Sequence, residues 1–200
     1  MIRILDCKNP NYLSRLKLIL NKRRFKSKIN TDIVIKIVKD IKKNKQKALL
    51  KYEKKFSKNA KIKPTKKEIN KSIKSLDPKI KNAIDFAYSR ILKFHSLQKN
   101  KNIKYVDKQN NKIEYRYIPI QSVGIYVPSN LPSTLLMNAI LAKKIAGVKR
   151  VVLANPRLNG KLNPAVMYAA KKCGISEIIS VGGSQAIASL AYIQKVNKIV

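Results

Sequence analysis

The sequence predicts an α/β protein with a mostly helical first half, a β-hairpin, and then a parallel sheet that carries helices on both of its faces. Three observations support this fold class. Apolar residues recur at helical spacing over the first hundred positions, and they alternate with polar residues near positions 103–118. From residue 122 onward, short apolar runs alternate with helical patterns across short connections, as in parallel sheets buried on both sides.

The first half contains several helix starts, each followed by an apolar stripe. Asn9-Pro10 has the signature of an N-cap followed by proline in the first turn, and Asp77-Pro78 has it again. Another helix is expected to begin at Thr31, and Thr65 has the spacing of a capping box with Glu68. A polar break over 43–46 interrupts the second stripe. The apolar stripes are Leu13, Leu16 and Leu20; Val34, Ile37, Val38 and Ile41; Ala48, Leu49, Tyr52 and Phe56; Ile69, Ile73 and Leu76; and Ile80, Ile84, Ala87, Ile91 and Leu92.

The second half begins with a hairpin and continues as alternating strands and helices. The two alternating runs of the hairpin, 103–106 and 113–118, flank a turn-rich gap over 107–111. Apolar strands are expected over 123–127, 150–154 and 177–181, and a fourth begins at 198. The intervening helices are expected to start at Ser133, at Asn163-Pro164 and at Ser184.

Length and composition exclude several classes of protein. The chain has 200 residues, of which 44% are apolar, enough for a folded core without disulfides. No apolar run is long enough for a transmembrane helix, and the first residues show no secretory signal, so we expect a cytoplasmic protein with no membrane partner. Cys7 and Cys173 are too far apart for a cysteine zinc module, and His95 is the single histidine. A metal site with several histidines is therefore excluded for this chain alone.

The net charge of +35 admits two interpretations. It would suit a lysine-rich protein that binds nucleic acid on an α/β scaffold, with the basic helices of residues 1–100 as the contact surface. However, the 45 basic residues are 37 lysines and 8 arginines, and they are spread along the chain without interleaved aromatics. A lysine surface produced by an A/T-rich genome is the other interpretation. Either way, we expect weak, non-specific binding to polyanions.

Two segments follow predicted strands where parallel sheets bind ligands, at their carboxyl ends. Residues 126–130 follow the first strand, and residues 181–185 follow the third. Gly182-Gly183 would let a ligand approach the backbone at a helix N-terminus that suits phosphate, or it makes only a tight turn. The full dinucleotide fingerprint is absent. Tyr126 alone would equally suit a packed aromatic.

Other candidates favour structural roles. His95 is expected near the C-terminal end of a helix, Cys173 as a small buried hydrophobe before a C-cap glycine, and the carboxylates are too scattered for an acid–base pair.

Several motifs together resemble the histidinol dehydrogenase family. They are residues 123–128, 136–139, 142–148 and 181–188, with looser matches at Ala48–Tyr52, Phe56, Ile91, Phe94-His95 and Gln98. The resemblance implies incomplete Rossmann-like domains, a homodimer, and the NAD-dependent, zinc-containing oxidation of L-histidinol to L-histidine through histidinal, in histidine biosynthesis. It also implies that Tyr126 and Gln185 contact NAD. The resemblance assigns no residue of this chain a catalytic role or a zinc ligand, since those of the family lie beyond residue 200.

The chain departs from the family pattern at three points. The loop over 128–133 is about three residues shorter and lacks two glycines, and Lys45-Gln46 stands where Gly-Asp is usual. The family is also about twice as long, and Lys198-Ile199-Val200 stops inside an expected strand. We therefore expect a fragment organised as a helical arm over 1–24, a helical region with a hairpin over 25–121, and an incomplete Rossmann-like domain over 122–200.

Overall fold

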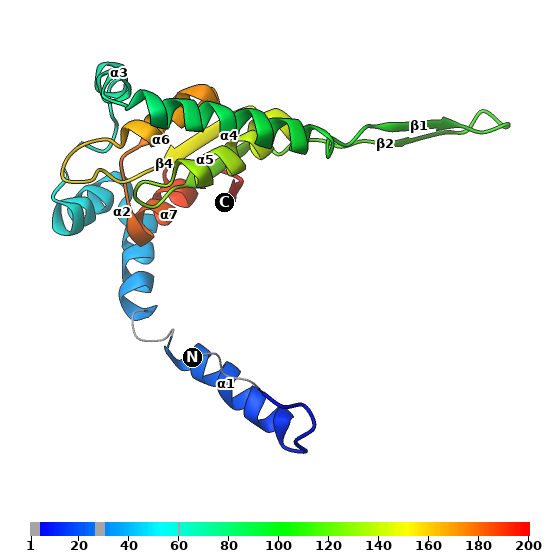
Figure 1. The fold of residues 1–200 in the computed structure, drawn as a ribbon, viewed down its shortest axis with the longest axis horizontal. Coiled ribbons are helices and arrows are strands. Elements are labelled where there is room, and N and C mark those ends of the chain that lie inside the picture. The colour runs from blue at the N-terminus through cyan, green and yellow to red at the C-terminus, as the bar shows by residue number, and fades with distance from the viewer. Residues whose placement is uncertain (1–4, 27–30, 60) are drawn as a thin grey trace.

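A computed structural model describes residues 5–26, 31–59 and 61–200. It has a compact α/β body from which a hairpin projects on one side and the first helix on another (Figure 1). The elements in chain order are α1 (Tyr12–Lys26), α2 (Thr31–Ser57), α3 (Lys66–Lys74), α4 (Pro78–Ser96), β1 (Ile103–Val106), β2 (Lys112–Tyr115), β3 (Ser122–Tyr126), α5 (Pro132–Ala139), the π-helix η2 (Ile140–Ile145), β4 (Arg150–Ala154), α6 (Pro164–Lys172), β5 (Glu177–Ile179), α7 (Gly183–Tyr192) and β6 (Lys198–Ile199).

The body is built on a four-stranded sheet in the order β5-β4-β3-β6, with every neighbouring pair parallel. Successive residues of β4 face opposite sides, so Leu153 joins one core and Val152 the other. Helices α4, α5, η2 and α6 cover the first face, and α2 and α7 cover the second. The α/β fold class and the two-sided parallel sheet are confirmed.

One glycine of the sheet sets how closely α7 approaches. Gly124 lies in β3, and a Cβ added there would lie 3.0 Å from side-chain carbons of both Leu190 and Val196. The bare backbone of β3 at this position therefore allows the second helical layer to pack directly on the strand.

Three predicted helix starts, at Thr65, Asp77 and Asn163, are confirmed by cap hydrogen bonds. Thr65 and Glu68 form both bonds of a capping box, and Asp77 and Asn163 cap α4 and α6 with their side chains. Two starts were wrong, and α7 begins at Gly183, one residue before the predicted Ser184. Helix α1 begins at Tyr12, because the Asn9 side chain accepts from the Asn11 amide in a turn before the helix. Helix α5 begins at Pro132 without a side-chain cap, so the predicted cap, Ser133, lies inside its first turn.

The polar break predicted in the second stripe is a kink in α2. Lys45 has φ 47° and ψ −124°, so α2 consists of two helical segments joined at this residue. Lysine is strained in this conformation because its Cβ crowds the backbone, and glycine adopts it freely. The kink therefore coincides with the position where the sequence departs from the family's usual Gly-Asp.

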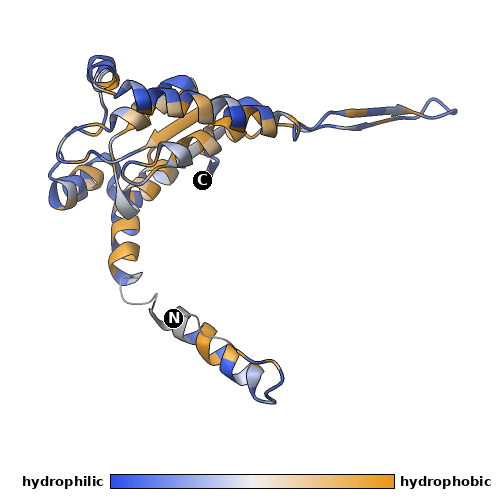
Figure 2. Cartoon of the chain, in the orientation of Figure 1, coloured by the Kyte–Doolittle hydropathy of each residue, from blue (hydrophilic) through white to orange (hydrophobic). Residues whose placement is uncertain are grey.

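The hairpin and α1 expose apolar side chains that amphipathic packing would bury. All eight residues of β1 and β2 are exposed, and within the described part of the chain no other element packs extensively on either face. Along α1 the predicted stripe Leu13, Leu16 and Leu20 is exposed as well. Figure 2 shows these apolar positions on the two projecting segments.

The two halves of the sequence share their cores. Ile84 of α4 packs with the β3 and β4 residues of one core, and Ile37 and Ile41 of α2 pack with those of the other. The domain boundaries at 24/25 and 121/122 stay predictions, and residues 1–4 and 27–30 of those segments lie outside the described residues. Among the residues that the structure describes, no helix has the length and apolar character needed to cross a membrane.

Candidate functional site

The sheet brings Tyr126 and the Gly182-Gly183 turn together at its carboxyl edge. Tyr126 ends β3 on the face that α7 covers, and its hydroxyl accepts a hydrogen bond from the Gly183 N–H at 3.0 Å. Gln185 lies two residues further along, in the first turn of α7. The two residues that the sequence predicts to contact a cofactor therefore meet around Gly183, although their strands are not neighbours in the sheet.

Both glycines of the turn are needed by its geometry. Gly183 has φ 58°, and a Cβ there would lie 2.9 Å from the side-chain oxygen Oε1 of Gln185. A Cβ on Gly182 would lie 3.0 Å from Pro156. The tight-turn interpretation is thus supported by the fold itself, and ligand contact at the turn stays a prediction.

Gln185 is held by a buried carboxylate. Its side-chain Nε2 donates to Oε1 of Glu53 at 2.9 Å, and the Gly182 N–H donates to the same oxygen at 3.3 Å. Only 1% of Glu53 and 4% of Gln185 are exposed. Gln185 therefore lies at a helix start that is buried under α2.

Glu53 was missed by sequence reasoning, although a signal exists. It lies one turn after Leu49 on the buried stripe of α2, where every neighbour on that face is apolar or aromatic. A carboxylate at a stripe position of a strongly basic chain is an exception to the pattern. Its other oxygen, Oε2, has no hydrogen-bond partner in the described part of the chain.

Asn155, directly after β4, was also missed, and it anchors the short loop that follows β3. Its side-chain amide donates to the carbonyl oxygens of Val127 at 2.9 Å and Ser129 at 2.8 Å. Ser129 has φ 54°, a conformation that this anchor helps to hold. The shortened 128–133 loop is therefore tied down at the sheet edge beside Tyr126.

A cavity of about 520 Å³ lies over the start of α7. Its walls come from both segments of α2 and from the Gly-Gly turn: Ile33, Val34, Ile37, Phe56, Ser57, Pro156 and residues 182–185. Gln185 reaches this cavity, whereas Tyr126 is not among its walls. The cavity is largely apolar on the α2 side and polar at the turn, a combination suited to a ligand with a flat apolar part and a few hydrogen-bonding groups.

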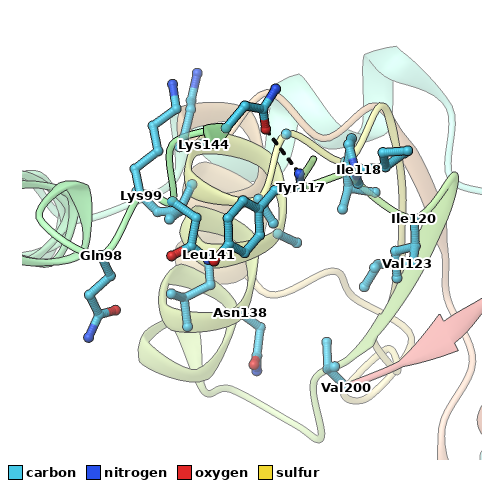
Figure 3. Close-up of a pocket in the computed structure, with 18 residues that line it drawn as sticks. Gln98, Lys99, Tyr117, Ile118, Ile120, Val123, Asn138, Leu141, Lys144 and Val200 are labelled. Atoms are coloured by element: carbon cyan, nitrogen blue, oxygen red, sulfur yellow. Dashed lines mark hydrogen bonds between the residues drawn. The ribbon is translucent and has the colours of Figure 1, made fainter. Parts of the chain in front are cut away.

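Two other cavities lie away from this edge. One of about 780 Å³ is at the base of the hairpin, between Ile118, Leu141, Lys144 and Val200 (Figure 3). The other, of about 980 Å³, lies between α3 and residues 157–164 and has Lys71, Lys74 and Lys161 around Glu68. Neither of these two cavities is lined by Tyr126 or Gln185, the predicted site residues.

The remaining candidates have structural roles. His95 lies in the last turn of α4, where its Nδ1 is 2.6 Å from the side-chain oxygen of Gln98. Burial raises the pKa of the Cys173 thiol to about 11, so this side chain behaves as the small hydrophobe that was predicted. No group of three or more His, Cys, Asp or Glu side chains suited to a metal ion occurs among residues 5–26, 31–59 and 61–200.

The strand order and the site at the carboxyl edge define a Rossmann-like α/β protein. The sequence matches the family model for histidinol dehydrogenase over residues 20–200, so the chain belongs to the histidinol dehydrogenase family. It is 58% identical to histidinol dehydrogenase of Pelagibacter ubique over 207 residues, which covers 100% of this chain and 48% of that protein.

Further comparisons agree. The chain is 42% identical to histidinol dehydrogenase of Campylobacter jejuni, and the match covers 84% of this chain and 40% of that protein. The crystal structure of histidinol dehydrogenase from Elizabethkingia anophelis superposes with a TM-score of 0.76 at 34% identity, covering 85% of this chain and 41% of that one. The chain thus spans about half the length of the relatives it matches. These similarities lend no support to the nucleic-acid-binding alternative.

Proposed function

We propose that this chain provides the NAD-binding part of a histidinol dehydrogenase that oxidises L-histidinol to L-histidine through histidinal. Membership of the family supports the reaction. The observation that carries the cofactor role is the convergence of Tyr126 and Gln185 on the Gly183 turn, at the carboxyl edge of a Rossmann-like sheet. Bound NAD would accept the hydride removed from the substrate.

The residues around the turn fit the binding of a dinucleotide without chemistry of their own. The Tyr126 hydroxyl and the Gln185 amide supply hydrogen bonds that orient a ligand without adding charge. Ile33, Val34 and Phe56 of α2 supply an apolar wall on one side of the cavity. The role of this chain would therefore be to bind and orient the cofactor.

The zinc ion that the family implies does not fit the described residues. They include a single histidine, His95, which lies in the last turn of α4 and bonds to Gln98, and they form no cluster of metal ligands. Zinc binding would need ligands that this chain does not supply. The chain alone is accordingly expected to be inactive toward histidinol.

A second copy of the chain is the partner that the family implies, and the exposed apolar residues of the hairpin and α1 are compatible with such a homodimer. The lysine-rich surface needs no separate function. Its weak attraction for polyanions follows from the charge of +35 and should fade as salt is raised.

A chimera tests the proposal: this chain is joined to the remaining part of the Pelagibacter ubique relative. The chimera should form NADH from histidinol when zinc is supplied, and the 200-residue chain should not. Tyr126→Phe and Gln185→Leu should each raise the KM for NAD by about 3- to 10-fold, the effect of losing one hydrogen bond. Gln185→Leu should also lower the melting temperature, because it removes a donor from Glu53.

Tyr105→Phe, on the exposed hairpin, is the matched control and should change neither quantity. A folded chimera that binds NAD but leaves histidinol unoxidised would contradict the proposed reaction. Unchanged KM values for NAD in both site variants would contradict the assigned cofactor contacts.

A further inference from the structure

The N-terminus of α7 already holds an anion, and that anion belongs to the chain. A helix start with a Gly-Gly turn ordinarily offers its free N–H groups and partial positive charge to a phosphate. Here the N–H of Gly182, the N-cap residue, donates to the Glu53 carboxylate, and the next N–H, of Gly183, donates to the Tyr126 hydroxyl. Two of the donors that a phosphate would use are therefore occupied.

Glu53 acts on the turn without a neutralising cation. In the described part of the chain, no lysine or arginine lies within ion-pair distance of Glu53, although the chain carries 45 basic residues. The carboxylate is also screened poorly, because only 1% of the residue is exposed. Its charge therefore acts mainly on the positive end of α7 and on any group that approaches the turn.

The same carboxylate fixes which end of the Gln185 amide faces a ligand. A carboxylate only accepts hydrogen bonds, so the amide nitrogen of Gln185 must be the atom that faces Glu53. The carbonyl oxygen Oε1 is then left on the side of Gly183, where an added Cβ would lie 2.9 Å from it. A ligand reaching this turn meets a hydrogen-bond acceptor backed by a negative charge.

We propose that Glu53 is a positioning and selectivity residue that keeps phosphate groups off the α7 turn and makes Gln185 bind a neutral hydrogen-bond donor. The groups of this class in a dinucleotide are sugar hydroxyls and the carboxamide. This inference rests on the proposed function for the identity of the ligand. If NAD is that ligand, its pyrophosphate lies away from the Gly-Gly turn, unlike in sites where such a turn cradles the phosphates.

The test follows individual amide signals by NMR of the ¹⁵N-labelled 200-residue chain. Local signals are essential because pyrophosphate will also contact the lysine-rich surface. Inorganic pyrophosphate should leave the Gly183 and Ser184 amide signals of the wild type unmoved. Glu53→Gln keeps an acceptor for Gln185 and Gly182 but removes the charge, so pyrophosphate should shift both signals with an affinity increased by about tenfold or more.

Glu114→Gln is the matched control. Glu114 is paired with Lys104 and Arg116 on the projecting hairpin, so its substitution raises the net charge by the same amount far from α7. It should leave the response of Gly183 and Ser184 unchanged. Pyrophosphate binding at these amides in the wild type would overturn the proposal, and this arm needs no variant to fold. An unchanged response in a folded Glu53→Gln variant would overturn it too.

NAD itself separates this proposal from the proposed function. NAD should shift the side-chain amide signals of Gln185 in the wild type. If they stay unmoved while both pyrophosphate results are as expected, the cofactor assignment fails and the role of Glu53 in excluding phosphate stands.

Discussion

The sheet body and the two projecting segments contain the same kinds of apolar residue in opposite environments. Ile125 and Leu153 in the sheet are 0% exposed, whereas Ile113 in the hairpin is 61% exposed and Ile118 beyond it is 81% exposed. The sheet residues Ile125 and Leu153 are buried within the body, because helices cover both faces of the sheet. The hairpin has a regular antiparallel register, but all eight of its strand residues are exposed. An alternating pattern therefore predicts a strand and its faces, but not what covers them.

The largest expected effect is a difference in stability between substitution of an apolar residue in the body and of one in the hairpin. Leu153→Ala should lower the free energy of unfolding by about 2–5 kcal/mol, because it leaves a cavity in the closed core beneath α5 and α6. Ile113→Ala on the hairpin should change it by less than about 0.5 kcal/mol. Denaturant unfolding of the 200-residue chain measures both. A loss of similar size in the two variants would mean that the hairpin is covered in solution.

The parts of the fold predictable from sequence are those set by local chemistry. Caps such as Thr65-Glu68 and Asp77 depend on side chains within three residues, and the strands of the parallel sheet follow from continuous apolar runs. The break in α2 was predictable because its polar residues interrupt the stripe. The π-helix after α5 was not, since the pattern over 133–147 suits an uninterrupted α-helix.

The site was predictable at the level of strand ends but not of individual contacts. The expectation that ligands bind past parallel strands placed Tyr126 and Gln185 at one edge, and the structure brings them together. That Glu53, more than 120 residues away in sequence, would hold Gln185 depends on how α2 packs over α7. The role of Asn155 likewise depends on the neighbouring β3 loop, which no local pattern of residues 150–160 specifies.

A smaller effect is expected at the kink that joins the two segments of α2. Lys45→Gly should raise the free energy of unfolding by about 1 kcal/mol, because glycine adopts φ 47° and ψ −124° without the strain that lysine bears. Part of the gain is offset by the greater freedom of glycine in the unfolded chain. Lys47→Gly, on the exposed helical side of the kink, is the control and should lower stability by about 1 kcal/mol. Destabilisation by both changes would show that Lys45 is not strained.

The smallest expected effect concerns two aspartates, one in the body and one in the projecting hairpin. Asp85 joins α4 to α6, with its carboxylate 2.7 Å from the Lys172 Nζ and 2.8 Å from the Tyr168 hydroxyl. The hydrogen bond from Lys172, and then that from Tyr168, lowers the pKa of Asp85 below its ordinary value. Asp107 also has a lowered pKa, because Asn111 and Gln109 donate to it, but these bonds stay within the hairpin turn.

A lowered pKa in the folded state means that the stabilisation is present above the ordinary aspartate pKa and is lost as the pH falls through the folded value. The melting temperature of the wild type should therefore decrease in acid partly because Asp85 becomes protonated. Asp85→Asn should melt slightly lower than the wild type at neutral pH, and the gap should close at the lowest pH. Asp107→Asn should follow the wild type throughout, because a hairpin whose strand residues are all exposed does not contribute its turn to the global melt. A pH-dependent gap for Asp107→Asn equal to that for Asp85→Asn would show that hairpin and body unfold as one unit.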